Sequence, residues 1–323
     1  MASKLTTSES RAAPSVPSSH PHAESPTEVA VIPEPATKVN SGTKDPVAAT
    51  HENDVSETPL ARLWTIAQAH SHPEIWGVTL ADPATHIPTQ IVLQKFLNAN
   101  DGDMDKTQLQ LTSTLDWRAR MQPLELTKKA FSKTKFGSLG FVTTYTVPTA
   151  EPAQPSSKEV FNWNIYGGAK SLEETFGDLT QFLEWRVAIM ELALYELSLA
   201  SATKPLTATD DPYKITQVHD YKSISFLRQP PYVKAASTET IKVFAQNYPE
   251  LLKEKFFVNV PVFMGFMYAL IKPFLAAKTA KKFHPMTNGA DLAREFPWGE
   301  QLPVEYGGKG AELAATGKET LHS

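Results

Sequence analysis

Hydrophobic and polar positions follow one pattern before residue 140 and another after it. Over 89–97 and 103–118, apolar residues recur every three or four positions, which is typical of amphipathic helices. Over 141–145 and 160–166 they alternate residue by residue, as in strands that bury one face. The chain therefore predicts a helical segment followed by a segment that contains a sheet.

Strands and helices alternate in the second segment. Helices are predicted over 178–199, 237–247 and 262–274, and strands over 215–226 and 255–260. Because a helix between two strands usually joins a parallel pair, this order predicts a partly parallel sheet covered by helices. The predicted fold class is α/β.

The ends of the chain differ in composition from its middle. Residues 1–58 are rich in Ser, Thr, Pro, Ala and Glu and contain no aromatic residue. They cannot bury enough apolar surface to offset the entropy cost of ordering, so we expect a disordered tail. We predict a helical subdomain over 59–138, an α/β domain over 139–308 and a polar C-terminal tail over 309–323.

Composition excludes several classes of function. The 323 residues contain no cysteine, which rules out disulfides, thiol catalysis and iron–sulfur clusters. Beyond residue 59 the chain holds 27 basic and 27 acidic residues, so we expect no nucleic-acid binding. The apolar stretch 256–271 is interrupted by Asn259 and Pro261 and is too short to span a bilayer. Phosphate-loop, hydrolase-elbow and zinc-protease motifs are absent, so we expect no enzyme.

Some polar residues fall on faces where apolar ones are expected. Arg186 lies on the apolar stripe of helix 178–199, where a buried guanidinium is costly unless an anion meets it. Alternation groups Asn162, Asn164 and Tyr166 on one strand face, groups Gln217, His219 and Tyr221 on a face of the next strand, and places Val218 and Ile224 opposite the second group. One interpretation is an ion pair of Arg186 with a core carboxylate beside ordinary core tyrosines. The other is an interior cavity with an anionic ligand.

Short motifs with specific order and spacing run through the chain. They occupy 93–100, 103–118, 248–250, 256–261, 272–275 and 302–308. Together they resemble the CRAL-TRIO family of lipid-binding proteins over about residues 60–308. The strings at 164–167, 217–222 and 282–286 are similar to a fungal branch of phosphatidylinositol transfer proteins within that family.

The resemblance implies an N-terminal helical bundle followed by a lipid-binding domain over 139–308. That domain has a pocket with a mixed or parallel sheet as its floor, closed by a mobile helical gate that corresponds to 262–274. A helix that merely packs into the core is the alternative for this segment. Enclosure is needed because exposing acyl chains to water costs about 0.8 kcal/mol per CH₂.

For phosphatidylinositol, the resemblance implies headgroup contacts from Glu250, Thr279 and Lys282. A carboxylate can accept hydrogen bonds from inositol hydroxyls, and a hydroxyl and an ammonium suit the phosphate. Lys278, Lys281 and Lys282 form either a solvated basic face or a contact with anionic membrane surfaces.

The same branch is associated with haem b. Carried over one by one, Tyr166, Arg186, His219, Tyr221 and Lys255 match positions that line the haem pocket. Tyr221 is implied as the axial iron ligand, since a phenolate favours ferric iron. His219 would support that ligand or compete for the metal. Arg186 and Lys255 suit the propionates, although Arg186 could instead hydrogen-bond the phenolate.

The function that the resemblance implies is non-enzymatic transfer of phosphatidylinositol, with haem b bound in the interior pocket. It implies a cytoplasmic protein that associates peripherally with endoplasmic reticulum or microsomal membranes. A dedicated haem-binding or oxidant-stress protein is the alternative. An oxidoreductase that uses the haem is a third class.

Overall fold

The computed structural model describes residues 57–147, 157–224, 229–261 and 281–323. Its first helix, α1 (Pro59–Gln68), begins after Thr58, whose hydroxyl oxygen accepts a hydrogen bond from the Ala61 amide at 3.2 Å. Proline suits this first position because its missing amide hydrogen would have no partner there. Of the predicted disordered tail 1–58, all but the last two residues lie outside the described residues.

Short helices and one small hairpin make up the segment predicted as a helical subdomain. After α1, the helices are α2 (Ile87–Ala99), α3 (Met104–Met121), α4 (Pro123–Leu126) and α5 (Lys133–Phe136). The hairpin consists of β1 (Glu74–Ile75) and β2 (Val78–Thr79). It turns through Trp76 and Gly77, which both have positive φ. The sequence pattern missed it because two-residue strands are too short to show alternation.

The main sheet in the described residues has the strand order β3-β4-β5-β6-β7. The strands are β3 (Gly140–Val147), β4 (Ser157–Ile165), β5 (Ile215–Asp220), β6 (Leu252–Val258) and β7 (Phe283–Pro285). β3 and β4 are antiparallel, and the other neighbouring pairs are parallel. The helices α7 (Leu179–Leu197) and α8 (Pro231–Asn247) connect parallel strands. The predicted α/β class with a mixed sheet is confirmed.

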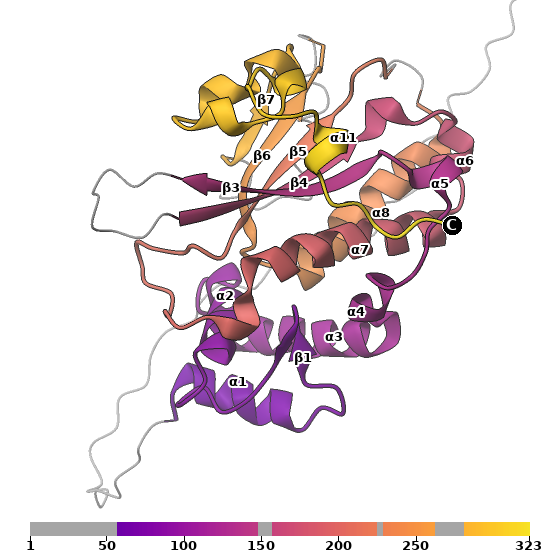
Figure 1. Cartoon of the computed structure of the whole chain (residues 1–323). Helices are drawn as coiled ribbons and strands as arrows, with labels where there is room; N and C mark the ends of the chain where they lie inside the picture. The colour runs from indigo at the N-terminus through magenta and orange to yellow at the C-terminus, as the bar shows by residue number, and fades with distance from the viewer. Residues whose placement is uncertain (1–56, 148–156, 225–228, 262–280) are drawn as a thin grey trace, which may run out of the picture. The chain divides into compact units, whose positions relative to one another are not determined.

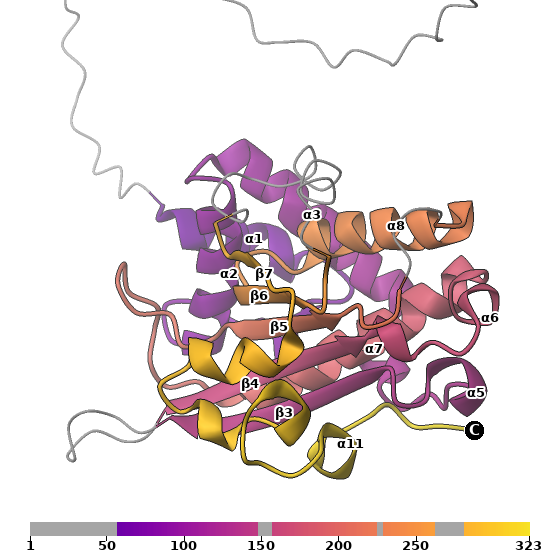
Figure 2. The same cartoon turned by 90° about the horizontal axis from the view of Figure 1, so that it is seen from above.

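Different layers cover the two faces of this sheet. α7 and α8 lie on one face, with the helical subdomain beyond them (Figure 1). Short helical turns and α11 (Leu313–Thr316) cover the other face (Figure 2). These turns are η4 (Gly289–Glu295), η5 (Gly299–Gln301) and η6 (Val304–Tyr306). No helix in the described ranges is long and apolar enough to cross a membrane.

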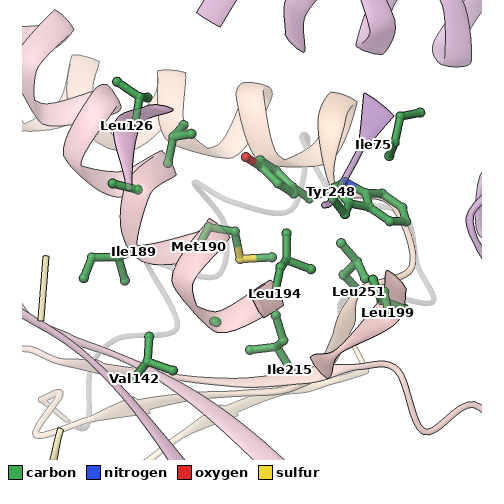
Figure 3. Close-up of a cluster of buried hydrophobic side chains, with 14 of the residues drawn as sticks. Ile75, Leu126, Val142, Ile189, Met190, Leu194, Leu199, Ile215, Tyr248 and Leu251 are labelled. Atoms are coloured by element: carbon green, nitrogen blue, oxygen red, sulfur yellow. The ribbon is translucent and has the colours of Figure 1, made fainter. Parts of the chain in front are cut away.

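The alternation in β4 and β5 separates two clusters of buried side chains. Phe161 and Trp163 pack with Leu292 and Tyr306 under the C-terminal turns. On the other face, Ile215 joins a core shared by the helical subdomain, α7 and the sheet (Figure 3). That figure shows Ile75 and Leu126 from the subdomain, Met190 and Leu194 from α7, and Tyr248 and Leu251 from the connection between α8 and β6. The helical subdomain is therefore continuous with the core of the α/β part.

Residues 309–323, predicted as a polar tail, pack against the rest of the structure. Leu313 is buried, and Lys318 exchanges two backbone hydrogen bonds with Val142 of β3, at 2.8 and 2.9 Å. Farther on, the Phe131 amide donates to the Leu321 carbonyl at 2.8 Å. The polar composition gave no sign that this segment packs on the sheet. Backbone groups at the edge of β3 hold it, and such contacts do not require apolar side chains.

The strand predicted over 215–226 ends at Asp220. The Asp220 carboxylate accepts a hydrogen bond from the Lys222 amide at 2.8 Å, and this side-chain-to-backbone bond forms a turn in place of further strand. Ile224, placed by alternation on the face of Val218, instead packs with the core on the face that carries α7. The predicted helix at 262–274 and the strand's last residues, 225–226, lie outside the described residues.

Candidate functional site

A cavity of about 1170 Å³ lies between the sheet, α7, α8 and the helical subdomain. Its wall includes the apolar side chains Phe176, Phe182, Met190, Val233, Phe244 and Phe257. The volume exceeds the 300–1,000 Å³ that is usual for sites of drug-sized molecules. The cavity is thus large enough for an amphiphile or a macrocycle.

All five residues that the resemblance assigns to the haem pocket line this cavity: Tyr166, Arg186, His219, Tyr221 and Lys255. The Tyr166 ring centroid lies 5.4 Å from that of His219 and 5.7 Å from that of Tyr221. Lys255 is on β6, next to the strand that bears His219. The structure brings together residues that are far apart in the sequence.

Arg186 is the most unusual member of this cluster. It is 1% exposed, and its Nε and Nη1 groups have no hydrogen-bond partner within the described residues. Its guanidinium lies 5.8 Å from the ring centre of Trp185 and 5.2 Å from that of Phe244. Two buried N–H groups are therefore available to an anion in the cavity.

The alternative interpretation gave Arg186 a carboxylate partner in the core. Among the described residues this is wrong. The buried carboxylate on α7 is Glu191, and Arg118 of α3 binds it, with 2.7 Å between Nη1 and Oε1. Arg118 also binds Glu74. The core ion pair exists, but it belongs to a different arginine.

His219 and Lys255 add further polar groups to the cavity floor. The His219 Nε2 atom is buried without a hydrogen-bond partner in the described residues. Burial, together with Lys255 and Arg186, lowers the pKa of His219 well below its usual value, so the ring is neutral. Burial, and then Arg186, lowers the pKa of Lys255 from 10.5 to about 7. Near neutral pH, Lys255 is therefore only partly charged.

The two tyrosines of the proposed haem cluster follow directly after strands. Tyr166 begins the turn η1 (Tyr166–Gly168) after β4, and Tyr221 follows β5, where its amide donates to the Val258 carbonyl at 3.1 Å. Burial raises the pKa of both phenols. A phenolate is therefore unfavourable here unless a strong cation lies beside it.

Two of the three headgroup residues implied by the resemblance line the same cavity. Glu250 Oε2 and Lys282 Nζ are 3.9 Å apart, and both side chains are partly exposed. Lys282 Nζ also donates to the Leu252 carbonyl at 2.8 Å, and burial lowers the pKa of its ammonium. The third residue, Thr279, lies outside the described residues, as does Lys278.

Sequence reasoning missed the part of the wall formed by α3 and α8. Gln110 of α3 and Val233, Ser237 and Thr240 of α8 line the cavity. The α8 positions recur at a spacing of three or four, which is the available signal. Serine and threonine concealed this face because a search for apolar periodicity passes over them.

Comparison with known proteins gives the relationships of the chain. The model of the CRAL/TRIO domain matches residues 166–308. The phosphatidylinositol transfer protein SFH5 of Chaetomium globosum is 67% identical over 270 residues, which are 82% of this chain and 62% of that protein. The chain thus spans less than two thirds of that relative. SFH5 of Pyricularia oryzae is 63% identical over 288 residues, which are 84% of this chain and 71% of that protein.

A solved structure agrees with these matches. The crystal structure of Sfh5 aligns with a TM-score of 0.67 and 26% identity, and it covers 85% of this chain and 94% of the crystallised one. An alignment over 85% of the chain includes the helical subdomain as well as the sheet, whereas the match to the CRAL/TRIO domain begins at residue 166. On these matches, the chain belongs to the CRAL/TRIO family, in the group formed by the fungal SFH5 proteins.

Proposed function

We propose that this protein binds phosphatidylinositol and carries it between membranes without chemical change. The cavity of about 1170 Å³, with its apolar wall and a few polar residues, is the observation that carries the proposal. A carrier must enclose the acyl chains, because each exposed CH₂ costs about 0.8 kcal/mol. The names of relatives more than 60% identical to this chain support the same function.

In this proposal Glu250 and Lys282 bind the headgroup. The Glu250 carboxylate accepts hydrogen bonds from inositol hydroxyls, while the Lys282 ammonium faces the phosphate. The Glu250 and Lys282 side chains form a weak ion pair at 3.9 Å. A headgroup, with its phosphodiester and inositol hydroxyls, could bind between them. Thr279 is proposed as a phosphate contact on the family resemblance alone. The protein would act in the cytoplasm, in transient contact with endoplasmic reticulum membranes.

Transfer of labelled phosphatidylinositol between vesicles tests this assignment. Glu250→Ala and Lys282→Ala should each slow transfer, because each removes a headgroup contact. Lys253→Ala is the matched control. Lys253 lies near the start of β6, three residues after Glu250, and forms a surface pair with Glu159. Unchanged transfer in both site variants would refute the headgroup assignment.

We further propose that the interior cluster holds haem b. The residues fit this group: Arg186 has two unpartnered N–H groups and Lys255 is a second cation, which suits two propionates. The described residues contain no group of three or more His, Asp or Glu that could hold a metal ion. The proposed iron ligand is instead the Tyr221 phenol.

When bound, haem would supply a ferric centre that stabilises a phenolate. Residues of the cavity offer groups that suit a bound haem. Arg186 can offer Nε and Nη1 to an anion. The neutral His219 ring, whose centroid lies 6.4 Å from that of Tyr221, offers a buried and unpartnered Nε2 atom beside the proposed ligand.

The absorption spectrum of freshly purified protein tests the haem proposal. We expect a Soret band that Tyr221→Phe abolishes and that Tyr195→Phe leaves in place, because Tyr195 is 80% exposed on the outer face of α7. A colourless preparation from haem-replete cells would contradict the proposal.

A dedicated haem-binding or oxidant-stress protein is the second candidate function. The unpartnered polar atoms of Arg186 and His219 favour it, because a lipid's acyl chains would leave them unsatisfied. Mass spectrometry of what copurifies separates the two functions: mostly lipid supports transfer, and haem at one equivalent without lipid supports the alternative.

A further inference from the structure

The helical subdomain holds the connection between α8 and β6, which carries Glu250. The last carbonyl groups of a helix have no partner within the helix. At the end of α8, Gln110 Nε2 donates to the Gln246 carbonyl at 2.9 Å, and Trp76 Nε1 donates to the Asn247 carbonyl at 3.0 Å. Both donors come from the helical subdomain. The position of this connection therefore depends on residues outside the α/β part.

Lys95 of α2 continues this set of contacts to Glu250 itself. Its Nζ donates to the Glu250 carbonyl at 3.0 Å and to the two carboxylate oxygens of Asp211 at 3.0 and 2.8 Å. The side chain is fully buried. An ammonium group is costly to bury, and an apolar side chain would usually be more stable at such a position. The charge of Lys95 is therefore better explained by the groups to which its ammonium donates, Asp211 and the Glu250 carbonyl.

The backbone at Glu250 needs such a contact. Glu250 has φ of 55°, in the left-handed region that residues other than glycine seldom occupy. Two nearby residues are also held: the carbonyl of Leu251, the next residue, accepts a hydrogen bond from the Ile215 amide at 2.8 Å, and Oη of Tyr248, two residues before, donates to Glu191 at 2.8 Å. At Glu250 itself, Lys95 donates the hydrogen bond to the backbone carbonyl, and it thereby fixes the orientation of the Glu250 side chain.

We infer that Lys95 is a positioning residue for lipid binding. Through its hydrogen bond to the Glu250 carbonyl, Lys95 keeps the Glu250 carboxylate beside Lys282 in the cavity. The inference rests on the proposed headgroup site. It assigns part of the headgroup recognition to the helical subdomain, although Lys95 itself touches no lipid.

The test is a mutant cycle on phosphatidylinositol capture from mixed phosphatidylinositol and phosphatidylcholine vesicles. Lys95→Met should lower phosphatidylinositol capture roughly 10-fold, the size usual for loss of a supporting contact. Glu250→Gln should do the same, and the double variant should capture no less than Glu250→Gln alone, because both changes disable one carboxylate. Lys95→Arg, which keeps the charge and donors, should restore part of the capture.

A merely structural role predicts different results. If Lys95 only stabilises the fold, the two losses multiply in the double variant, and phosphatidylcholine capture falls in parallel with phosphatidylinositol capture. Either result would overturn the inference, as would normal capture by folded Lys95→Met. If Glu250→Gln itself has no effect, the headgroup site is wrong, and the inference falls with it.

Two controls keep the test decisive. Lys158→Met makes the same replacement in a surface pair with Glu196, and it should leave capture unchanged. Circular dichroism checks the fold of each variant. If Lys95→Met does not fold, Lys95→Met with Asp211→Asn removes both buried charges together, and the same cycle is measured on that background.

Discussion

At the scale of single residues, the buried donors of the cavity determine what it can bind. Arg186 lies among aromatic rings with two N–H groups unpartnered in the described residues. A buried donor without a partner costs about 1–3 kcal/mol, and a bound anion recovers this cost. These donors thus make the protein less stable than its packing alone would, and an anion bound to them would stabilise it.

We predict that Arg186→Met makes the guest-free protein more stable by about 1–3 kcal/mol, because it removes unsatisfied donors and keeps the volume. The same change should weaken binding of protoporphyrin IX, which carries two carboxylates. Urea unfolding and porphyrin fluorescence measure the two effects. Arg120→Met, on the exposed side of α3, should change neither.

Lys255 should make anion binding depend on pH. The pKa of its ammonium is about 7 in the guest-free cavity, and a bound anion favours the charged form. Affinity for protoporphyrin IX should therefore fall as pH rises from 6 to 8. The lowered pKa of His219 keeps that ring neutral in this window. Lys255→Met should remove the slope; a slope that persists in this variant would contradict the assignment.

At the scale of elements, the site depends on how two strands end. Tyr166 and Tyr221 follow β4 and β5, and the turns after them touch. A Cβ atom on Gly167 would lie 2.0 Å from the Lys222 carbonyl oxygen. Behind this contact, the Asp220 carboxylate accepts a hydrogen bond from Tyr306 Oη at 2.9 Å. Glycine at 167 allows the close approach that sets the two phenols side by side.

Gly167→Ala should destabilise the protein by about 1–3 kcal/mol, the usual cost of overpacking, and should also lower the Soret absorbance per folded molecule. Gly168→Ala is the matched control, because the nearest atom to its Cβ would be a flexible Leu139 methyl at 3.2 Å. Thermal unfolding and absorption spectra measure both variants. Equal effects in the two would show that the contact at Gly167 has no special role.

The pattern of the sequence predicted β3 to β6 and the faces of β4 because a strand has a fixed period of two, but it gave no sign of β7, which is three residues long. It failed after Asp220, where a hydrogen bond from the side chain to the backbone ends the strand. It also failed for the segment around Lys318, which is held by backbone groups that leave no mark in the sequence. The roles of the site residues came from family motifs, while the pattern alone indicated only that Arg186 and the polar strand faces with Tyr166, His219 and Tyr221 were out of place.

At the scale of the whole molecule, a buried ion cluster joins the helical subdomain to the α/β part. Arg118 of α3 binds Glu74 at 2.8 Å and Glu191 of α7 at 2.7 Å, and Tyr248 also donates to Glu191. Neither carboxylate could be identified from the sequence as the partner of Arg118, because they are distant along the chain. The cluster lies in the core that both parts share.

Arg118→Met should cost about 3–5 kcal/mol of unfolding free energy, because it leaves the Glu191 carboxylate buried without its cation. Lys128→Met, in an exposed pair with Glu125, should cost less than about 1 kcal/mol. Chemical denaturation monitored by tryptophan fluorescence compares them. Similar losses in the two variants would mean that the buried cluster contributes no more than a surface pair.

The segment that covers the edge of β3 has a consequence for synthesis. Lys318 and Leu321 bind strand and loop residues that the ribosome makes much earlier, and the turns that cover one face of the sheet are also made late. A nascent chain therefore holds β3 with an open edge and an uncovered aromatic face, which are features that favour aggregation. We expect the sheet to be completed only after residues 318–321 leave the exit tunnel, and chaperones to shield it until then.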